Sequence, residues 1–155
     1  EFVRKGTESL GYLYRIKRSP HNKHAALEVL TTLWVGRPEA EIGCAVIDYL
    51  SSHLDARHIP FSEFFRIAKA THLAERDAVL NIVNYLSGAH LHLLEKGFEY
   101  IEDDLAVEID SLQAKAAYDA NINPLTGQFD GAVKKNIFVY FLPSENAKHV
   151  LGSAV

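Results

Sequence analysis

Between His58 and Ile109 the spacing of hydrophobic residues changes from a helical period to a strand period, and this change constrains the fold more than any other feature of the chain. Pro60 and Ser62 stand where a first helix would open, and the Ser62 hydroxyl is placed to accept hydrogen bonds from free N–H groups near its start. Residues 74–87 then carry apolar side chains at the i, i+3, i+4, i+7 spacing of an amphipathic helix. The first half of the stretch therefore predicts two helices joined by a short turn.

The second half of the stretch indicates a β-hairpin. From His90 the period falls toward two, which predicts a strand over His90–Ile101 with a bulge or turn at Lys96-Gly97. Glu102-Asp103-Asp104 forms a polar tip, and Leu105–Ile109 returns as the partner strand. Two helices followed by two antiparallel strands are therefore expected.

This order of elements resembles the helix-turn-helix and wing of the winged-helix superfamily. The resemblance covers roughly residues 38–110 and rests on element order and periodicity, without a motif that would name one family. It implies an α+β fold with a three-helix core and a β-hairpin wing. It also implies one of two roles, because winged helices most often bind DNA, while many serve as protein-interaction or assembly domains.

Segments on both sides extend this core. Apolar spacing predicts helices over His24–Val35 and Glu39–His53, of which the second would be the first helix of the winged-helix core. A short helix is expected over Asp110–Tyr118. Asn136–Leu142 is a nearly continuous apolar run, which predicts a strand buried on both faces. Its partner would be either a strand over Leu10–Arg18 or the wing hairpin. Alternatively, this run and the helix at 24–35 would mediate dimerisation.

Length and composition favour a single folded domain. The chain has 155 residues, of which 48% are hydrophobic and 23% charged, as is ordinary for a globular protein. We expect a basic N-terminal arm (1–24), a core (38–110) and a C-terminal extension (111–155). The sequence contains no Met, so its first residue is not an initiator, and we expect a fragment of a longer protein.

Charge is divided unevenly along the chain. Residues 1–24 have a net charge of +4, and residues 25–155 have −8. Within the arm, residues 10–18 alternate like a strand with one basic face, which includes Arg15 and Lys17, and Arg18 ends the stretch. This face is either a solvated, charge-protected edge or a contact for nucleic acid or an acidic partner. From His90 to Asp110 a single cation, Lys96, stands against seven acidic residues, which argues against this wing lying on a DNA backbone.

The helix at 74–87 is the candidate recognition helix. With its apolar residues facing inward, Asn81 and Asn84 lie on the outer face, where amide side chains can hydrogen-bond adenine edges in the major groove. Arg66, Lys69 and Arg76 could hold phosphates, and Arg15, Lys17 and Arg18 of the arm would add electrostatic affinity. Asp77 opposes this role, because its carboxylate would repel a phosphate.

Other kinds of site find little support. His90-X-His92 places two imidazoles on one face of the expected strand, but a zinc site needs three or four ligands, and ordinary half-exposed histidines are the simpler interpretation. The single Cys44 is expected to pack inside a helix, and its lack of a disulfide partner suits a reducing cytoplasm. There is no nucleophile elbow, phosphate loop, dinucleotide-binding turn or membrane-spanning run. We therefore expect no enzyme activity, metal, cofactor or membrane partner.

Two functions follow as expectations. The first is a non-enzymatic, nucleic-acid-associated winged-helix module that binds DNA through the helix at 74–87 and the basic arm. The second is a protein-interaction or oligomerisation module whose acidic wing docks a partner. Clustering of the basic side chains on one face would favour DNA, and a large apolar contact surface would favour assembly.

Overall fold

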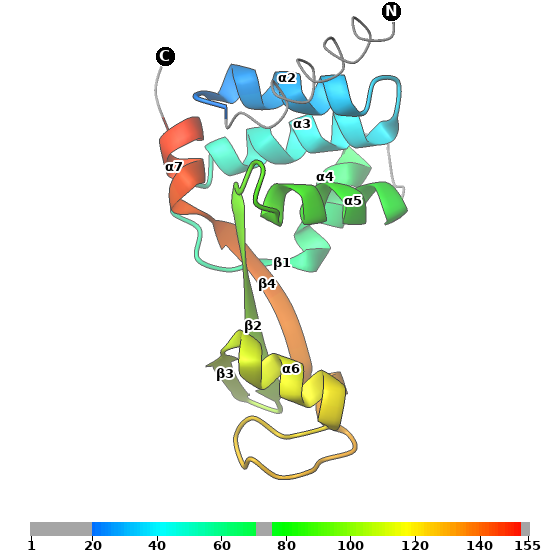
Figure 1. The fold of residues 1–155 in the computed structure, drawn as a ribbon, viewed down its shortest axis with the longest axis vertical. Helices are drawn as coiled ribbons and strands as arrows, with labels where there is room; N and C mark the ends of the chain where they lie inside the picture. Colours follow the sequence, from blue (N-terminus) through cyan, green and yellow to red (C-terminus); the bar gives the residue numbers. More distant parts are fainter. Residues whose placement is uncertain (1–19, 71–75, 153–155) are drawn as a thin grey trace, which may run out of the picture.

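The computed structural model describes residues 20–70 and 76–152 of the chain. A helical head, made of α2, α3, α4, α5 and α7, lies at one end, and two long strands lead from it to a smaller body at the other (Figure 1). The elements are α2 (Lys23–Leu33), α3 (Pro38–Ser51), β1 (Ile59–Pro60), α4 (Phe61–Ala70), α5 (Arg76–Ser87), β2 (Leu94–Glu102), β3 (Leu105–Ile109), α6 (Ser111–Ala120), the 3-10 helix η1 (Val133–Asn136), β4 (Ile137–Pro143) and α7 (Glu145–Leu151). The predicted α+β class is confirmed.

The first two helices of the head begin where the sequence favours a helix start. Asn22 caps α2 by accepting a hydrogen bond from the Ala25 N–H, and Pro38 occupies the first turn of α3, where its missing N–H costs nothing. Between them Gly36 has a φ of +72°, a conformation that favours glycine. Both predicted helices are therefore present, with ends shifted by one or two residues.

Helices α4 and α5 pack against α3 and supply much of the head core. The apolar residues predicted to face inward from α5 are buried, namely Val79, Ile82, Val83 and Leu86. Pro60 lies in β1, opposite Tyr140 of β4, rather than in the first turn of α4. The predicted turn at 71–73 and the first residues of the predicted helix at 74–87 fall outside the described residues.

The sheet is antiparallel, with the strand order β1-β4-β2-β3. The hairpin of β2 and β3 and its acidic tip are confirmed, with Asp103 at a φ of +52° in the turn. The prediction that the first strand starts at His90 is wrong, because residues 88–93 form a turn and an extended link to β2. The predicted bulge at Lys96-Gly97 is also wrong: the ladder to β4 is continuous, and Gly97 instead leaves room for the Tyr140 ring.

Strand β4 lies inside the sheet, between β1 and β2. Its partner is thus the first strand of the predicted hairpin, one of the two expected alternatives, while Leu10–Arg18 lies outside the described residues. The prediction that this strand is buried on both faces holds for most of its length but is wrong at Phe138, whose side chain is 45% exposed. The reason is that Ile137 packs under α6, so the next side chain along the strand, Phe138, faces away from that helix.

The distal part of the molecule has a small core of its own. Helix α6 packs across β2, and Tyr100, Ile109, Ala114, Ala117, Val133 and Ile137 are buried there, separately from the head core. Asp110 and Gln113 form a capping box at the start of α6, as the expected helix at 110–118 requires. Within residues 20–70 and 76–152, no helix has the length and apolar character needed to cross a membrane.

Candidate functional site

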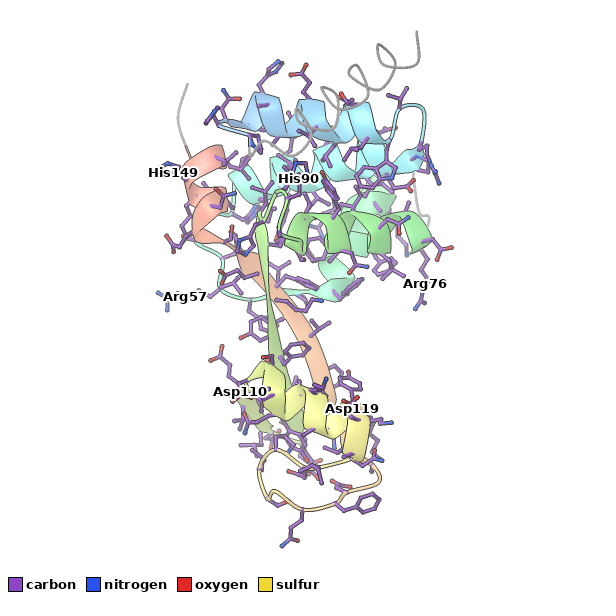
Figure 2. All side chains as sticks on the ribbon, viewed as in Figure 1. Arg57, Arg76, His90, Asp110, Asp119 and His149 are labelled. Carbon is purple, nitrogen blue, oxygen red and sulfur yellow. The ribbon has the colours of Figure 1, made fainter. Side chains whose placement is uncertain are left out.

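The part of the chain that projects from the head, residues 98–138, is called the distal arm below. It contains eight acidic and three basic residues, a net charge of −5. Asp110 and Asp119, labelled in Figure 2, mark the two ends of α6 on this arm. A surface of this charge attracts cationic partners and repels phosphate backbones.

The distal arm also holds most of the large apolar side chains that the fold leaves exposed. Among the described residues, six of the seven exposed large hydrophobic residues belong to it: Leu105, Leu112, Tyr118, Leu125, Phe129 and Phe138. Leu112 on α6 is 76% exposed and Phe129 is 73% exposed, whereas the described part of the head contributes only Val35. Exposed aromatic and aliphatic residues concentrated on one small body are typical of protein-contact surfaces.

Phe129 and Leu125 project from a loop that is held by many hydrogen bonds. The Asn123 side chain accepts hydrogen bonds from the backbone N–H groups of Leu125 and Thr126, at 2.8 Å and 3.3 Å. Its amide nitrogen donates to the Tyr100 hydroxyl and to Asp130. Asn123 is buried, so this side chain fastens the loop to the core under α6. The loop therefore presents its apolar residues from a fixed scaffold.

On the face of the sheet opposite α6, called the open face below, two carboxylates lie directly opposite each other. Glu99 of β2 pairs with Glu108 of β3, an arrangement that is unfavourable for like charges. Glu99 is hydrogen-bonded to His58 over 2.8 Å, and the Tyr140 hydroxyl donates to Glu108. The His58 ring stacks on Tyr140, with ring centroids 4.6 Å apart. The hydrogen bond to Glu108, together with burial, raises the pKa of Tyr140 to about 12.

The structure places the predicted recognition-helix residues on α5 but gives them different surroundings. Asn84 is exposed, and Arg76 points away from the head at the start of the helix (Figure 2). The Asn81 amide donates a hydrogen bond of 3.2 Å to the buried Glu39 carboxylate at the start of α3. The Asn81 side chain is thus engaged in an intramolecular hydrogen bond, and a DNA contact would have to compete with that bond.

The phosphate-binding candidates on α4 also differ from one another. Arg66 forms an ion pair with Glu63 one turn earlier, and its Nε lies 3.0 Å from both carboxylate oxygens, so its charge is largely neutralised. Lys69 is exposed near the end of the helix. Arg15, Lys17 and Arg18 lie outside the described residues. The structure therefore brings Lys69 and Arg76 to the two helix ends that flank residues 71–75.

The two histidines considered for metal binding do not lie on a strand, so that prediction is wrong. His90 and His92 fall in the segment before β2, where the Tyr85 hydroxyl contacts His90 Nδ1 and His92 adopts a φ of 44°. Burial lowers the pKa of His90 and raises that of Tyr85 to about 12, so both remain uncharged near neutrality. Among the residues that the structure describes, no group of three or more His, Cys, Asp or Glu side chains could hold a metal ion.

Sequence reasoning found the acidic tip but missed the exposed apolar surface beyond it. The missed residues lie on α6, in the loop at 121–132 and at the start of β4. The sequence-based prediction assigns these segments to a C-terminal extension and places no site there. A signal existed at Leu112, since it stands on the opposite side of α6 from Ala114 and Ala117. Comparisons of the chain with protein-family models, with characterised proteins and with solved structures found no match.

Proposed function

We propose that this protein is a non-enzymatic winged-helix module whose distal arm docks a partner protein. The winged-helix part of the proposal is supported by the order α3, β1, α4, α5 and then an antiparallel hairpin. The chain departs from the simplest form of that order, because β4 joins the sheet beside β2 after a long insertion. The insertion, residues 110–136, carries four of the six exposed large apolar residues of the distal arm: Leu112, Tyr118, Leu125 and Phe129.

The docking role is supported by one observation: exposed apolar side chains and a large negative charge occur together on the distal arm. Six exposed large apolar side chains lie on a body of net charge −5. Apolar anchors supply contact energy when a partner buries them, and a surrounding acidic rim steers a basic partner to them. The loop held by Asn123 reduces the ordering cost of binding, because it is already fastened in the free chain.

Site-specific photo-crosslinking tests this role. A benzophenone amino acid is placed at Leu112 or Phe129 of the arm, or at Val35 of the head, which is 75% exposed and serves as the matched apolar control. We expect the arm positions to form a defined protein adduct in the cells that make this protein, and Val35 to form none. Equal crosslinking from all three positions, or none from the arm, would contradict the docking role.

Binding of duplex DNA is the second candidate function. It is favoured by the exposed positions of Asn84, Arg76 and Lys69 around α5, together with the net charge of +4 over residues 1–24. Asn84 would approach base edges, Arg76 and Lys69 would hold phosphates, and Arg15, Lys17 and Arg18 would add affinity. The intramolecular bonds of Asn81 and Arg66 make these two residues weaker contributors.

Fluorescence anisotropy with labelled duplex DNA, repeated as salt rises, tests the second candidate. DNA binding by this route predicts an affinity that falls steeply with salt and weakens when Arg15, Lys17 and Arg18 are replaced by Ala. The variant Lys115→Ala, on the distal arm, is the matched control and should bind as the parent does. No binding even at low salt would remove this candidate.

A further inference from the structure

Strand β3 is the free edge of the sheet. Within the described residues it pairs with β2 alone, so alternate backbone N–H and C=O groups along it have no ladder partner. The strand contains no proline, its residues Leu105, Ala106 and Glu108 are exposed, and Val107 is half-buried. An extended segment from another chain can therefore add to this edge by main-chain hydrogen bonding.

The register of β3 sets the side-chain pattern that such a segment needs. Val107 pairs with the buried Tyr100, so Leu105 and Val107 lie on the face covered by α6, whereas Glu108, paired with Glu99, lies on the open face. An added strand would place every second side chain beside Leu105 and Val107, and the alternate side chains beside Glu108. The pattern that fits is an alternation of apolar and basic residues.

The acidic charge around β3 favours a partner segment that is basic. Every charged residue from Glu99 to Asp110 is acidic, including the tip at 102–104. The opposed carboxylates of Glu99 and Glu108 repel each other, and each accepts a side-chain hydrogen bond, from His58 and Tyr140 respectively. A cation on the open face would reduce this repulsion. Two copies of this edge would repel each other, so edge-to-edge pairing of β3 with β3 is disfavoured.

The chain itself contains a segment with the required alternation: Tyr14-Arg15-Ile16-Lys17, within the basic stretch at 12–18. We infer that residues 12–18 of a second copy add to the free edge of β3 as a fifth strand, with Arg15 and Lys17 beside Glu108. This inference rests on the proposed docking role of the distal arm and names its partner as another copy of the same chain.

The same copy cannot supply this strand. Pro20 stands at the start of α2, which lies at the end of the head away from the distal arm (Figure 1). The link from Arg18 to Pro20 spans at most ~7 Å of extended chain, less than the thickness of one layer of packed helices at about 8–10 Å. Reciprocal exchange between two copies would give a closed dimer, and one-way addition would give a longer series.

Sedimentation velocity of the full chain, over a range of concentrations at low and high salt, tests the inference. We expect association at low salt that weakens by roughly tenfold or more when the charge is reversed at either surface, by Glu108→Lys or by Arg15→Glu with Lys17→Glu. Asp55→Lys makes the same charge change at an exposed position of the head, between α3 and β1, and should leave association unchanged. Mixing the Glu108→Lys protein with the Arg15→Glu, Lys17→Glu protein should restore association, because one complementary pair of surfaces is rebuilt.

Hydrogen exchange locates the contact independently of folding effects of these variants. A synthetic peptide of residues 10–19 added to the full chain should slow amide exchange in β3 and leave the loop at 121–132 unchanged. A chain that is monomeric at every concentration and gains no protection in β3 from the peptide overturns the inference, as does association that both charge reversals leave intact.

The crosslinking experiment tests the docking role separately from the self-addition. Adducts from Leu112 or Phe129 to a different protein, with a monomeric chain, would retain the docking role and reject the self-addition. Absence of adducts from the arm, together with a chain that is monomeric at every concentration, would reject both the docking role and the self-addition.

Discussion

At the level of single residues, Tyr140 joins the two bodies of the molecule. It sits on β4 where the head ends, stacks on His58, covers Gly97 and donates a hydrogen bond to Glu108 of β3. The sequence shows Tyr140 only as one member of an apolar run. Its role depends on the strand register, which places Glu108 and Gly97 within its reach.

Replacing Tyr140 by Phe should lower stability and change its pH dependence. Loss of the hydrogen bond to a charged acceptor should cost about 1.5–3 kcal/mol near neutral pH. In the parent, the pKa of Tyr140 is raised to about 12 in the folded chain from the ordinary tyrosine value of about 10, so its contribution is complete below about pH 10 and is lost as the pH rises toward 12. Tyr140→Phe should therefore show a smaller fall in the free energy of unfolding over that range.

Urea unfolding at a series of pH values measures both effects. Tyr118→Phe, at a half-exposed tyrosine on α6, is the matched control and should follow the parent. An unchanged pH slope in Tyr140→Phe would show that this hydroxyl does not hold its proton more tightly in the folded state.

Asn123 is the second residue whose replacement should have a large, local effect. Asn123→Ala removes the acceptor of two backbone N–H groups and the donor to Tyr100 and Asp130. Because these groups are partly or fully buried, we expect a loss of about 1–3 kcal/mol and faster amide exchange over residues 121–130. Gln128→Ala, at an exposed position of the same loop, should change neither quantity, and equal effects of the two variants would refute the fastening role of Asn123.

At the level of secondary-structure elements, the contact between β2 and β4 connects the head to the distal arm. Seven residue pairs align from Leu94–Pro143 to Tyr100–Ile137, with no interruption at Gly97. A Cβ atom at residue 97 would lie 2.3 Å from Cζ of Tyr140, too close for a rigid ring to tolerate. Glycine is therefore required here by the close approach of a side chain, and not by a turn.

Gly97→Ala should accordingly destabilise the sheet. Overpacking of this kind costs about 1–3 kcal/mol, and thermal unfolding should show a lower midpoint. Gly131→Ala is a suitable control, because the nearest atom to its added Cβ is 4.0 Å away. The cost of Gly97→Ala should become small when Tyr140 is also replaced by Ala. If it does not, the Tyr140 ring is not the cause.

At the level of the whole molecule, two separate cores share one sheet. The head core includes Val46, Leu50 and Ile82, and the smaller core of the arm includes Tyr100, Ala117 and Ile137. A smaller core buries less apolar area, so the arm should open at a lower free energy than the head.

Ile137→Ala tests this division. It should weaken the arm core by about 2–4 kcal/mol and speed amide exchange in α6, while α3 keeps the protection it has in the parent. Val46→Ala in the head core is the counterpart and should lower the protection of α3 and α5. If Ile137→Ala loosens both bodies equally, the two cores unfold as a single cooperative unit.

Most of the helices and strands could be predicted from the sequence, because periods of 3.6 and 2 are local properties of the chain. It predicted α2, α3, α5, the hairpin of β2 and β3 with its acidic tip, and the inward face of α5, all confirmed. It also predicted Asn81, Asn84, Arg66, Lys69 and Arg76 as candidate DNA contacts, which stay predictions.

How these segments combine depends on contacts between distant parts of the chain, which the structure shows. It placed β4 between β1 and β2 and bonded Asn81 of α5 to Glu39 of α3. It also gathered the exposed apolar residues of four separate segments onto the acidic arm. Such pairings join residues far apart in the chain, so they depend on strand register and packing, and no local pattern in the sequence encodes them.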